Sequence, residues 1–335
     1  MLDLERPVAD RLLLTTIPGA VDYLYEELRH VPEVEITGRQ RDGVTVEVTG
    51  DLTALAANRY YSTAAVILGD DPVARLRESL ASGVLSTLPR APRFRIGAIG
   101  DERWPLRDRL EDLGWANEPG DWDLNIETGP SGLVAEVGQL YWTSRFGDLL
   151  RAPASTTPVI AAVMIRLAKI EPGHTLLDPF CGAGTLLVEA LRGPAGHLLG
   201  ADHDRRWIQA TGRNLELARE RIDRTDSAAT PITLWRGDAR HLPLRDGSVD
   251  RIVSNLPFGK RVGSHRHNLT LYPDVLREYA RVLTRSGRAV LLTEDKRLFA
   301  QSVQRTRGIR VIKEIEFATG GAHPSAYVIA TRRGR

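Results

Sequence analysis

A glycine-rich turn between an apolar strand and a helix constrains the fold of this chain most strongly. Residues 178–185 read Asp-Pro-Phe-Cys-Gly-Ala-Gly-Thr and lie between the apolar run 175–177 and the helix-like stretch 186–191. Because glycine has no side chain and tolerates unusual backbone conformations, Gly182 and Gly184 predict a ligand close to the backbone. The pattern is not the Gly-x-Gly-x-x-Gly of dinucleotide enzymes and lacks the Lys-Ser/Thr pair of a phosphate loop. NAD and ATP are therefore disfavoured.

The second half of the chain alternates strands and helices. Apolar runs predict strands at 175–177, 198–201, 232–235, 250–254 and 289–293. Such alternation is typical of a parallel, doubly wound sheet, which binds ligands at the carboxyl ends of its strands. Two more runs, 311–317 and 326–330, flank Gly320-Gly321. We expect these two runs to form a hairpin that makes the final strand antiparallel.

The first half has a different order of elements. Its patterns predict a strand at 11–17, a helix with Val21, Leu24, Tyr25 and Leu28 on one face, strands at 34–36 and 44–48, a helix over 52–64 and a strand at 65–68. This is the β-α-β-β-α-β order of the split ferredoxin-like arrangement. A further block, with helices over 73–88 and 104–113 and strands at 94–96, 124–126 and 133–137, predicts a small α/β module. We therefore expect two domains, residues 1–150 and 151–335.

The two halves differ in charge. Residues 1–150 contain 15 arginines, no lysine and 25 acidic residues, whereas residues 151–335 contain 30 basic and 18 acidic residues. Basic side chains displace the counterions around phosphates, so the second half favours a nucleic-acid surface. A solvated surface is the alternative interpretation.

Composition also excludes several classes of protein. The 335-residue chain has no apolar run near the roughly 20 residues of a membrane helix and no signal-peptide core, so we expect a cytoplasmic protein without a membrane partner. Its one cysteine, Cys181, excludes an internal disulfide, and the eight histidines show no zinc-ligand spacing with it. We expect no metal site. No obligate protein partner is evident.

Acidic residues follow three of the predicted strands, at the edge where ligands bind. Asp178 closes the first strand, where its carboxylate can accept hydrogen bonds from the loop or from a ligand's ammonium group. Asp202 closes the second and can bind both hydroxyls of a ribose or cap the next helix, although Asp204 is the expected N-cap. Asp238 and Ala239 follow the third strand, where a carboxylate and a backbone amide can read an adenine edge or form a simple turn.

Two other segments are candidates for ligand contact. Thr157 precedes Pro158 and a helix over 159–167 that is apolar almost all round, so it is expected to cap that helix, with ligand contact by 155–157 as a second possibility. Residues 255–259, Asn-Leu-Pro-Phe-Gly, end the fourth strand. They offer an amide, two carbonyls near a proline and an aromatic ring, which can hold a flat base with an exocyclic amine.

These motifs resemble those of a known superfamily. The segment 178–185 resembles motif I of S-adenosylmethionine-dependent methyltransferases, and residues 255–258 resemble motif IV, the Asn/Asp-Pro-Pro-Tyr/Phe tetrad of the amino-methylating members. The run 256–264, with Asn268, Leu271-Tyr272-Pro273, 280–282 and 287–293, is similar to the THUMP-domain tRNA guanine-N2 methyltransferases. The similarity covers roughly residues 153–330. Over 1–150 only the element order and the start Thr16-Ile17-Pro18-Gly19-Ala20 look similar.

The resemblance implies both a fold and a domain assignment. The expected fold class is α/β, with a C-terminal Rossmann-like methyltransferase sheet and an N-terminal α+β ferredoxin-like/THUMP-like region. Residues 1–150 would be a ferredoxin-like plus degenerate THUMP-like substrate-binding region. Residues 151–335 would be a class I S-adenosylmethionine-dependent methyltransferase domain.

The resemblance also implies methyl transfer to the N2 amine of a guanosine in tRNA. The Asn255 side-chain oxygen and the Leu256 carbonyl would accept hydrogen bonds from that amine, Pro257 would fix the backbone, and Phe258 would stack on a base flipped out of its stem. Cys181 would be an inert, buried residue of the loop. The residues that would hold the cofactor are Thr157, Asp178, Phe180, Cys181, Gly182, Gly184, Asp202, Asp238, Ala239 and Asn255.

The chain departs from the family pattern in two respects. Leu256 replaces the first proline of the tetrad, and Asn255 replaces the aspartate of the Asp-Leu-Pro-Phe form, so the acceptor is weaker. The acidic N-terminal half would contact RNA through a few arginines, namely Arg90, Arg93, Arg95, Arg107 and Arg109, or leave the contact to the basic segment 260–267. Alternative functions are methylation of guanine in ribosomal RNA, methylation of adenine or cytosine in DNA, and silent binding of cofactor or RNA.

Overall fold

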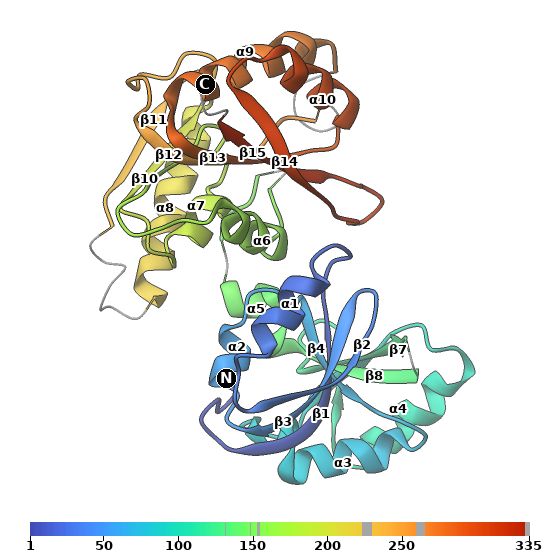
Figure 1. Cartoon of the computed structure of the whole chain (residues 1–335). Coiled ribbons are helices and arrows are strands. Elements are labelled where there is room, and N and C mark those ends of the chain that lie inside the picture. The colour runs from blue at the N-terminus through green and yellow to red at the C-terminus, as the bar shows by residue number, and fades with distance from the viewer. Residues whose placement is uncertain (131, 148, 153–154, 223–229, 259–264, 332–335) are drawn as a thin grey trace. The chain divides into compact units, whose positions relative to one another are not determined.

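The computed structural model describes residues 1–130, 132–147, 149–152, 155–222, 230–258 and 265–331. The chain divides into two compact units, Met1–Asp148 and Leu149–Arg335 (Figure 1). Within the described residues, no helix is long and apolar enough to cross a membrane.

The described residues of the first unit form an eight-stranded sheet in the order β2-β3-β1-β4-β8-β7-β5-β6. Its strands are β1 Val8–Thr15, β2 Val34–Arg39, β3 Gly43–Gly50, β4 Thr63–Ile67, β5 Arg93–Ile96, β6 Ala116–Asn117, β7 Leu124–Gly129 and β8 Gly132–Val137. Its helices are α1 Val21–Leu28, α2 Thr53–Ala57, α3 Pro72–Ser82, α4 Arg103–Glu111 and α5 Trp142–Phe146, with short 3-10 turns at Val84–Thr87, Gly100–Glu102 and Gly138–Leu140.

The ferredoxin-like arrangement is confirmed. Strand β1 lies between β3 and β4 and is antiparallel to both, and β2 completes that half of the sheet. The predicted helix over 52–64 is too long, because α2 ends at Ala57. Asn58 takes an extended conformation (φ −62°, ψ 135°), and its Oδ1 accepts a hydrogen bond from Tyr60 N at 2.9 Å. This local turn competes with the helix.

Two further details of the first unit differ from expectation. In α1, Tyr23 is buried with Leu24 and Leu28, whereas Tyr25 is only half-buried. The block after residue 72 continues the same sheet, since β8 pairs antiparallel with β4, a pairing that was not predicted. The long-range pairing of these two strands has no local sequence signal.

The described residues of the second unit form a seven-stranded sheet in the order β11-β10-β9-β12-β13-β15-β14. Its strands are β9 Thr175–Asp178, β10 His197–Asp202, β11 Ile232–Arg236, β12 Val249–Asn255, β13 Leu283–Thr293, β14 Ile309–Glu316 and β15 Ser325–Thr331. Its helices are α6 Pro158–Ala168, α7 Thr185–Ala190, α8 Arg205–Arg221, α9 His265–Val282 and α10 Lys296–Arg305. All five predicted strands are present and parallel, and β15 is antiparallel to both β13 and β14, which confirms the expected hairpin.

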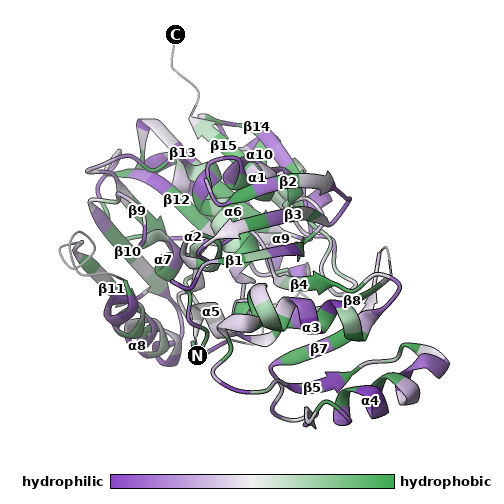
Figure 2. Cartoon of the chain, turned by 90° about the horizontal axis from the view of Figure 1, so that it is seen from below, coloured by the Kyte–Doolittle hydropathy of each residue, from purple (hydrophilic) through white to green (hydrophobic). Residues whose placement is uncertain are grey.

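Helices cover both faces of the second sheet. Figure 1 shows α6, α7 and α8 on one face and α9 and α10 on the other. Alternate strand residues such as Leu177, Ile252 and Leu291 join one buried cluster with Tyr272 of α9 and Phe299 of α10. Strand β10 is largely hydrophobic, whereas α8 carries many hydrophilic residues (Figure 2). This layering brings the ends of β9, β10 and β12 to one edge of the sheet.

Candidate active site

The glycine turn joins β9 to α7, and its two glycines have different roles. Gly184 precedes α7 with φ +83°, and a Cβ placed there would lie 2.8 Å from Thr211 Cγ2. Gly182 has φ +52°, but the nearest atom to its added Cβ is Ala152 Cβ at 4.0 Å. Gly184 is therefore required by packing and conformation, whereas Gly182 leaves open space where a ligand can approach the backbone.

Asp178 is a buried carboxylate at the end of β9. It is 1% exposed, and its Oδ1 accepts hydrogen bonds from Phe180 N at 3.2 Å and from Ser254 Oγ at 3.0 Å. Burial raises the pKa of Asp178 to about 7, and the Asp202 carboxylate contributes to the rise. A nearby cation would favour the charged form of Asp178.

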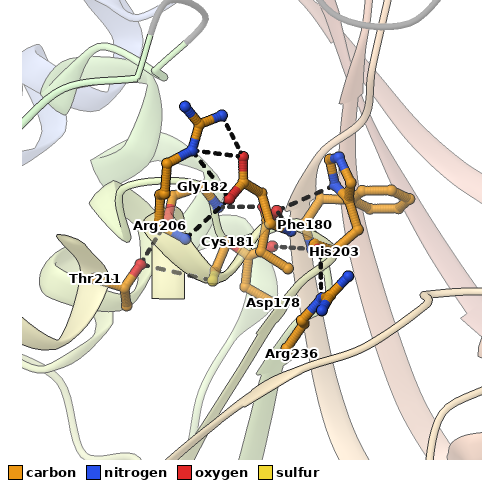
Figure 3. Close-up of polar contacts among 10 residues, drawn as sticks. Asp178, Phe180, Cys181, Gly182, His203, Arg206, Thr211 and Arg236 are labelled. Atoms are coloured by element: carbon orange, nitrogen blue, oxygen red, sulfur yellow. Dashed lines mark hydrogen bonds and ion pairs between the residues drawn. The ribbon is translucent and has the colours of Figure 1, made fainter. Parts of the chain in front are cut away.

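Asp202 ties the glycine turn to the end of β10, and its neighbours Gly182 and His203 are labelled in Figure 3. Its Oδ2 accepts a hydrogen bond from Gly182 N at 3.0 Å, and its Oδ1 accepts from Asp204 N at 2.9 Å and lies 3.2 Å from His203 Nδ1. Asp204 is the N-cap of α8, as predicted, because its side chain accepts from Arg206 N. Hydrogen bonds from Arg206 lower the pKa of Asp204 to about 2. Asp202 therefore does not cap this helix.

The loop is also held from α8. Thr211 Oγ1 donates to Gly182 O at 2.7 Å and lies 3.6 Å from Cys181 Sγ. Cys181 is buried, and burial, together with the Asp178 carboxylate, raises the pKa of its thiol above its usual range. The thiol is therefore protonated at neutral pH and is not a nucleophile.

Thr157 occupies the N-cap position of α6, but its side chain does not cap the helix. Its backbone is extended, and Pro158 is at the first helical position, as predicted. The hydroxyl makes no capping bond, however, so the prediction of side-chain capping is wrong. Within the described part of the chain, Thr157 Oγ1 is buried and has no hydrogen-bond partner. Such an atom usually contacts a ligand or water.

The turn after β11 holds its own carboxylate. Asp238 accepts from Arg240 N at 2.9 Å and from Arg240 Nη2 at 2.6 Å, and these hydrogen bonds lower the pKa of Asp238. Ala239 is buried, at 4% exposure. The carboxylate thus stabilises a local turn, and contact of Asp238 and Ala239 with a ligand stays a prediction.

The tetrad follows directly from β12. Asn255 pairs with Leu292 of β13, and Leu256 N donates to Leu292 O at 3.0 Å. The Leu256 side chain is 3% exposed and belongs to the core, which explains how leucine is accommodated at this position. Pro257 O accepts two hydrogen bonds from α9. Phe258 is half-buried, and Gly259 and residues 260–264 of the basic segment lie outside the described residues.

Sequence patterns did not indicate two residues that support the site, Thr211 and Ser254. Asn268 and Tyr272 belong to the family resemblance, but the sequence assigned them no role. Ser254 directly precedes the tetrad, and its polar side chain in an apolar strand is the one local signal. Its hydrogen bond to Asp178 links two neighbouring parallel strands, β9 and β12. The glycine turn and the tetrad therefore lie at one edge of the sheet.

The arginines predicted to contact RNA have partners within the first unit. Arg93 pairs with Asp121 and Asp123, and Arg90 lies 3.6 Å from Asp123. The other pairs are Arg95 with Asn125 and the Trp122 ring, Arg107 with Asp108 and Glu111, and Arg109 with Asp71. The acidic partners of Arg90, Arg93, Arg107 and Arg109 offset part of the charge that these arginines would offer to phosphates. Contact of the five arginines with RNA stays a prediction.

Comparison with known proteins agrees with the fold and the site. Residues 149–325 match the RMKL-like methyltransferase domain. The chain is 33% identical over 183 residues to the tRNA (guanine(6)-N(2))-methyltransferase THUMP3 of Bos taurus, a match that covers 53% of this chain and 36% of that protein. It is 36% identical over 177 residues to the tRNA (guanine(6)-N2)-methyltransferase of Thermus thermophilus, covering 52% of this chain and 50% of that protein.

A solved structure matches over nearly the whole chain. TrmN from Thermus thermophilus has a TM-score of 0.68 and 26% identity, covering 96% of this chain and 99% of that chain. The described sheet order and the two motifs at its edge define a Rossmann-like, class I methyltransferase fold. The chain belongs to the RMKL-like methyltransferase domain family. It spans between a third and a half of the length of the curated relatives THUMP3 and the Thermus enzyme.

Proposed function

We propose that this chain transfers a methyl group from S-adenosylmethionine to the exocyclic N2 amine of a guanosine in tRNA. The observation that carries the proposal is the 3.0 Å hydrogen bond from Ser254 Oγ to Asp178 Oδ1, which links the glycine turn to the strand that ends in the tetrad. A donor site and an acceptor site on adjacent strand ends suit direct group transfer. The names of the two tRNA guanine-N2 methyltransferase relatives support the choice of amine and RNA.

The residues at the turn fit S-adenosylmethionine. Among the described residues, Asp178 Oδ2 accepts no hydrogen bond, so it can bind an ammonium group. Gly182 is open on the side where a Cβ would project, and Thr157 Oγ1 is buried without a partner in the described residues. Asp202 lies at the end of β10, where its carboxylate would accept hydrogen bonds from ribose hydroxyls. The cofactor would supply a methyl group on a sulfonium, already activated for transfer.

The tetrad would position the acceptor. In this proposal, the Asn255 side-chain oxygen and the Leu256 carbonyl accept the two N–H groups of the amine. Phe258 stacks on the guanine ring, an interaction worth about 1–3 kcal/mol per base in single-stranded recognition. The nitrogen would gain a bond to the methyl carbon while the bond between that carbon and the sulfonium sulfur breaks, which would leave S-adenosylhomocysteine as a neutral thioether. The nitrogen would then lose one proton to water. Since the site needs orientation rather than a strong base, an amide is sufficient at position 255.

The first unit is proposed to be a ferredoxin-like plus degenerate THUMP-like substrate-binding region. The sheet order β2-β3-β1-β4 and the match to TrmN over both units support this assignment. Because the first unit is acidic and the five arginines predicted to contact RNA have partners within it, we propose that the basic second unit provides most of the attraction to phosphates.

The test is methylation by the purified full chain. The protein is incubated with methyl-labelled S-adenosylmethionine and, separately, with tRNA, ribosomal RNA fragments and DNA, followed by nucleoside analysis. We expect N2-methylguanosine in tRNA. Methyladenine or methylcytosine in DNA, or no label in any substrate, would contradict the proposal.

A variant pair assigns the acceptor residue. Asn255→Ala should remove most turnover while binding of S-adenosylmethionine, measured by calorimetry, persists. Asn117→Ala, which alters an exposed asparagine of β6, serves as the control and should keep wild-type activity. Equal loss of turnover and cofactor binding in Asn255→Ala would show that Asn255 belongs to the cofactor site instead.

A further inference from the structure

The carbonyl of Pro257, the third residue of the tetrad, accepts two hydrogen bonds from one helix. Asn268 Nδ2 donates at 2.7 Å and Tyr272 Oη donates at 2.8 Å. The donors are four residues apart, so α9 presents both from one face. They are 0% and 1% exposed, respectively. Because a carbonyl oxygen has two lone pairs, both acceptor positions of Pro257 are filled from within the protein.

A series of hydrogen bonds, each donating to the next group, ends at the Pro257 carbonyl. Tyr272 Oη also lies 2.8 Å from Thr293 Oγ1 of β13, and Thr293 Oγ1 accepts from Asp295 N at 3.0 Å. Tyrosine has one hydroxyl proton, which is donated to Pro257, so Thr293 donates to Tyr272. Burial raises the pKa of the Tyr272 phenol, which keeps this proton in place. Linked hydrogen bonds of this kind polarise and strengthen one another.

This series of hydrogen bonds fixes the backbone at the point where the β-ladder ends. Leu256 N still donates to Leu292 O, but Pro257 has no amide proton and cannot extend the ladder. The Pro257 carbonyl and the Phe258 amide share one planar peptide group. Fixing the carbonyl therefore fixes the plane from which the chain continues to Phe258.

We propose that Asn268 and Tyr272 are positioning residues for methyl transfer. They turn the Pro257 carbonyl toward α9, so that this carbonyl does not compete with the Asn255 side-chain oxygen and the Leu256 carbonyl for the amine. Two acceptors match the two N–H groups of a primary exocyclic amine. The reaction in this inference rests on the proposed function, whereas the geometry rests on hydrogen bonds within the protein.

The test removes the hydroxyls of Tyr272 and Thr293 one at a time and keeps the packing of each side chain. Tyr272→Phe retains the ring and its edge contact with Phe299, whose centroid is 6.2 Å away. Tyr327→Phe is the matched control, because Tyr327 packs on the same Phe299 at 4.5 Å and is buried. It lies in β15, and the hydrogen bonds of Pro257 O and Tyr272 Oη among the described residues do not include its hydroxyl. Thr293→Val and Thr293→Ser form a second pair, of which only the serine variant keeps the hydroxyl.

Three properties are measured for each variant: kcat and KM for tRNA, the Kd for S-adenosylmethionine, and deuterium exchange of the peptide that covers residues 255–258. In Tyr272→Phe and Thr293→Val we expect kcat to fall roughly 10- to 100-fold, with KM and Kd within about 3-fold of wild type. Exchange in this peptide should rise. Thr293→Ser and Tyr327→Phe should behave as wild type.

The outcomes separate this inference from the proposed function. Unchanged exchange and kcat in Tyr272→Phe, an equal loss in Tyr327→Phe, or a parallel loss of cofactor binding would overturn the positioning role. If wild type methylates no RNA, the proposed function fails. Faster exchange in Tyr272→Phe but not in Tyr327→Phe would still support the fixed carbonyl, because that measurement needs no substrate.

Discussion

Gly184 packs so closely on Thr211 that a single added carbon would lie 2.8 Å from Thr211 Cγ2. The same residue has φ +83°, a conformation that L side chains rarely adopt. Gly184→Ala should therefore lower the free energy of unfolding by about 2–4 kcal/mol, from backbone strain and overpacking together. It should also displace the Thr211 hydroxyl from Gly182 O. Chemical denaturation measures the loss.

Gly182→Ala is the matched comparison within the same turn. Its φ of +52° costs about 1–2 kcal/mol, but the space around the new methyl group is open. We expect Gly182→Ala to lose less stability than Gly184→Ala. For each kcal/mol of stability lost, Gly182→Ala should lose more S-adenosylmethionine affinity than Gly184→Ala does. Equal stability losses in the two variants, with unchanged affinity in Gly182→Ala, would show that no ligand approaches this backbone.

Asp178 should make stability depend on pH in the direction opposite to that of most carboxylates. Its pKa is raised from 3.8 to about 7, so its folded form binds the proton more tightly than the unfolded chain does. The contribution of Asp178 to the free energy of unfolding is complete below its pKa in the unfolded chain. This contribution, up to about 4 kcal/mol, is lost as the pH rises through the pKa of Asp178 in the folded protein. Asp178→Asn keeps an acceptor for Ser254 and should raise the melting temperature at pH 8 more than at pH 5.

Cofactor binding gives Asp178 a second, independent measurement. An ammonium group beside the carboxylate would lower its pKa, so binding should release a proton, and wild-type affinity should rise with pH through about 7. Asp178→Asn should bind more weakly and without this pH dependence. Asp204→Asn is the control, because hydrogen bonds from Arg206 lower the pKa of that half-buried carboxyl to about 2. A pH-independent affinity in wild type would contradict cofactor contact by Asp178.

The carboxylates at the carboxyl ends of β10 and β11, Asp202 and Asp238, should differ in their importance for cofactor binding. Asp202 holds Gly182 N and is buried, whereas the Asp238 carboxylate is already paired with Arg240. Asp202→Asn should weaken S-adenosylmethionine binding by roughly 10- to 100-fold, as expected for hydrogen bonds to a charged group, and Asp238→Asn by about 3-fold or less. Titration calorimetry measures both. A larger loss of S-adenosylmethionine affinity in Asp238→Asn than in Asp202→Asn would show that Asp238 is the more important carboxylate for cofactor binding.

The second sheet could be predicted from the sequence because each buried parallel strand is a short apolar run bounded by turns. The same pattern placed Asp178 and Asp202 at strand ends. The length of α2 could not be predicted, since one local interaction, from Tyr60 N to Asn58 Oδ1, ends the helix early. Nor could the pairing of β4 with β8, because it depends on two strands separated by about 70 residues.

The sequence identified Asn268 and Tyr272, which hold the tetrad, but it could not reveal their function. Asn268 and Tyr272 belonged to the family resemblance, yet their function depends on α9 packing beside the end of β12. Ser254 and Asp178 are 76 positions apart. Contacts of this kind follow from sheet order, which residue periodicity does not encode.

The Thr157 hydroxyl is buried and has no partner among the described residues, and substitution of Thr157 tests whether this hydroxyl contacts the cofactor. Thr157→Val removes the hydroxyl and keeps the shape, so stability should stay within about 0.5 kcal/mol of wild type or increase, because no hydrogen bond to a described residue is lost. S-adenosylmethionine affinity should fall roughly 3- to 10-fold. Asp204→Ala removes a side chain that does cap a helix, and it should cost about 1 kcal/mol. Thermal denaturation with and without the cofactor measures both variants; a loss of stability in Thr157→Val equal to that in Asp204→Ala, with affinity unchanged, would restore capping as the role of Thr157.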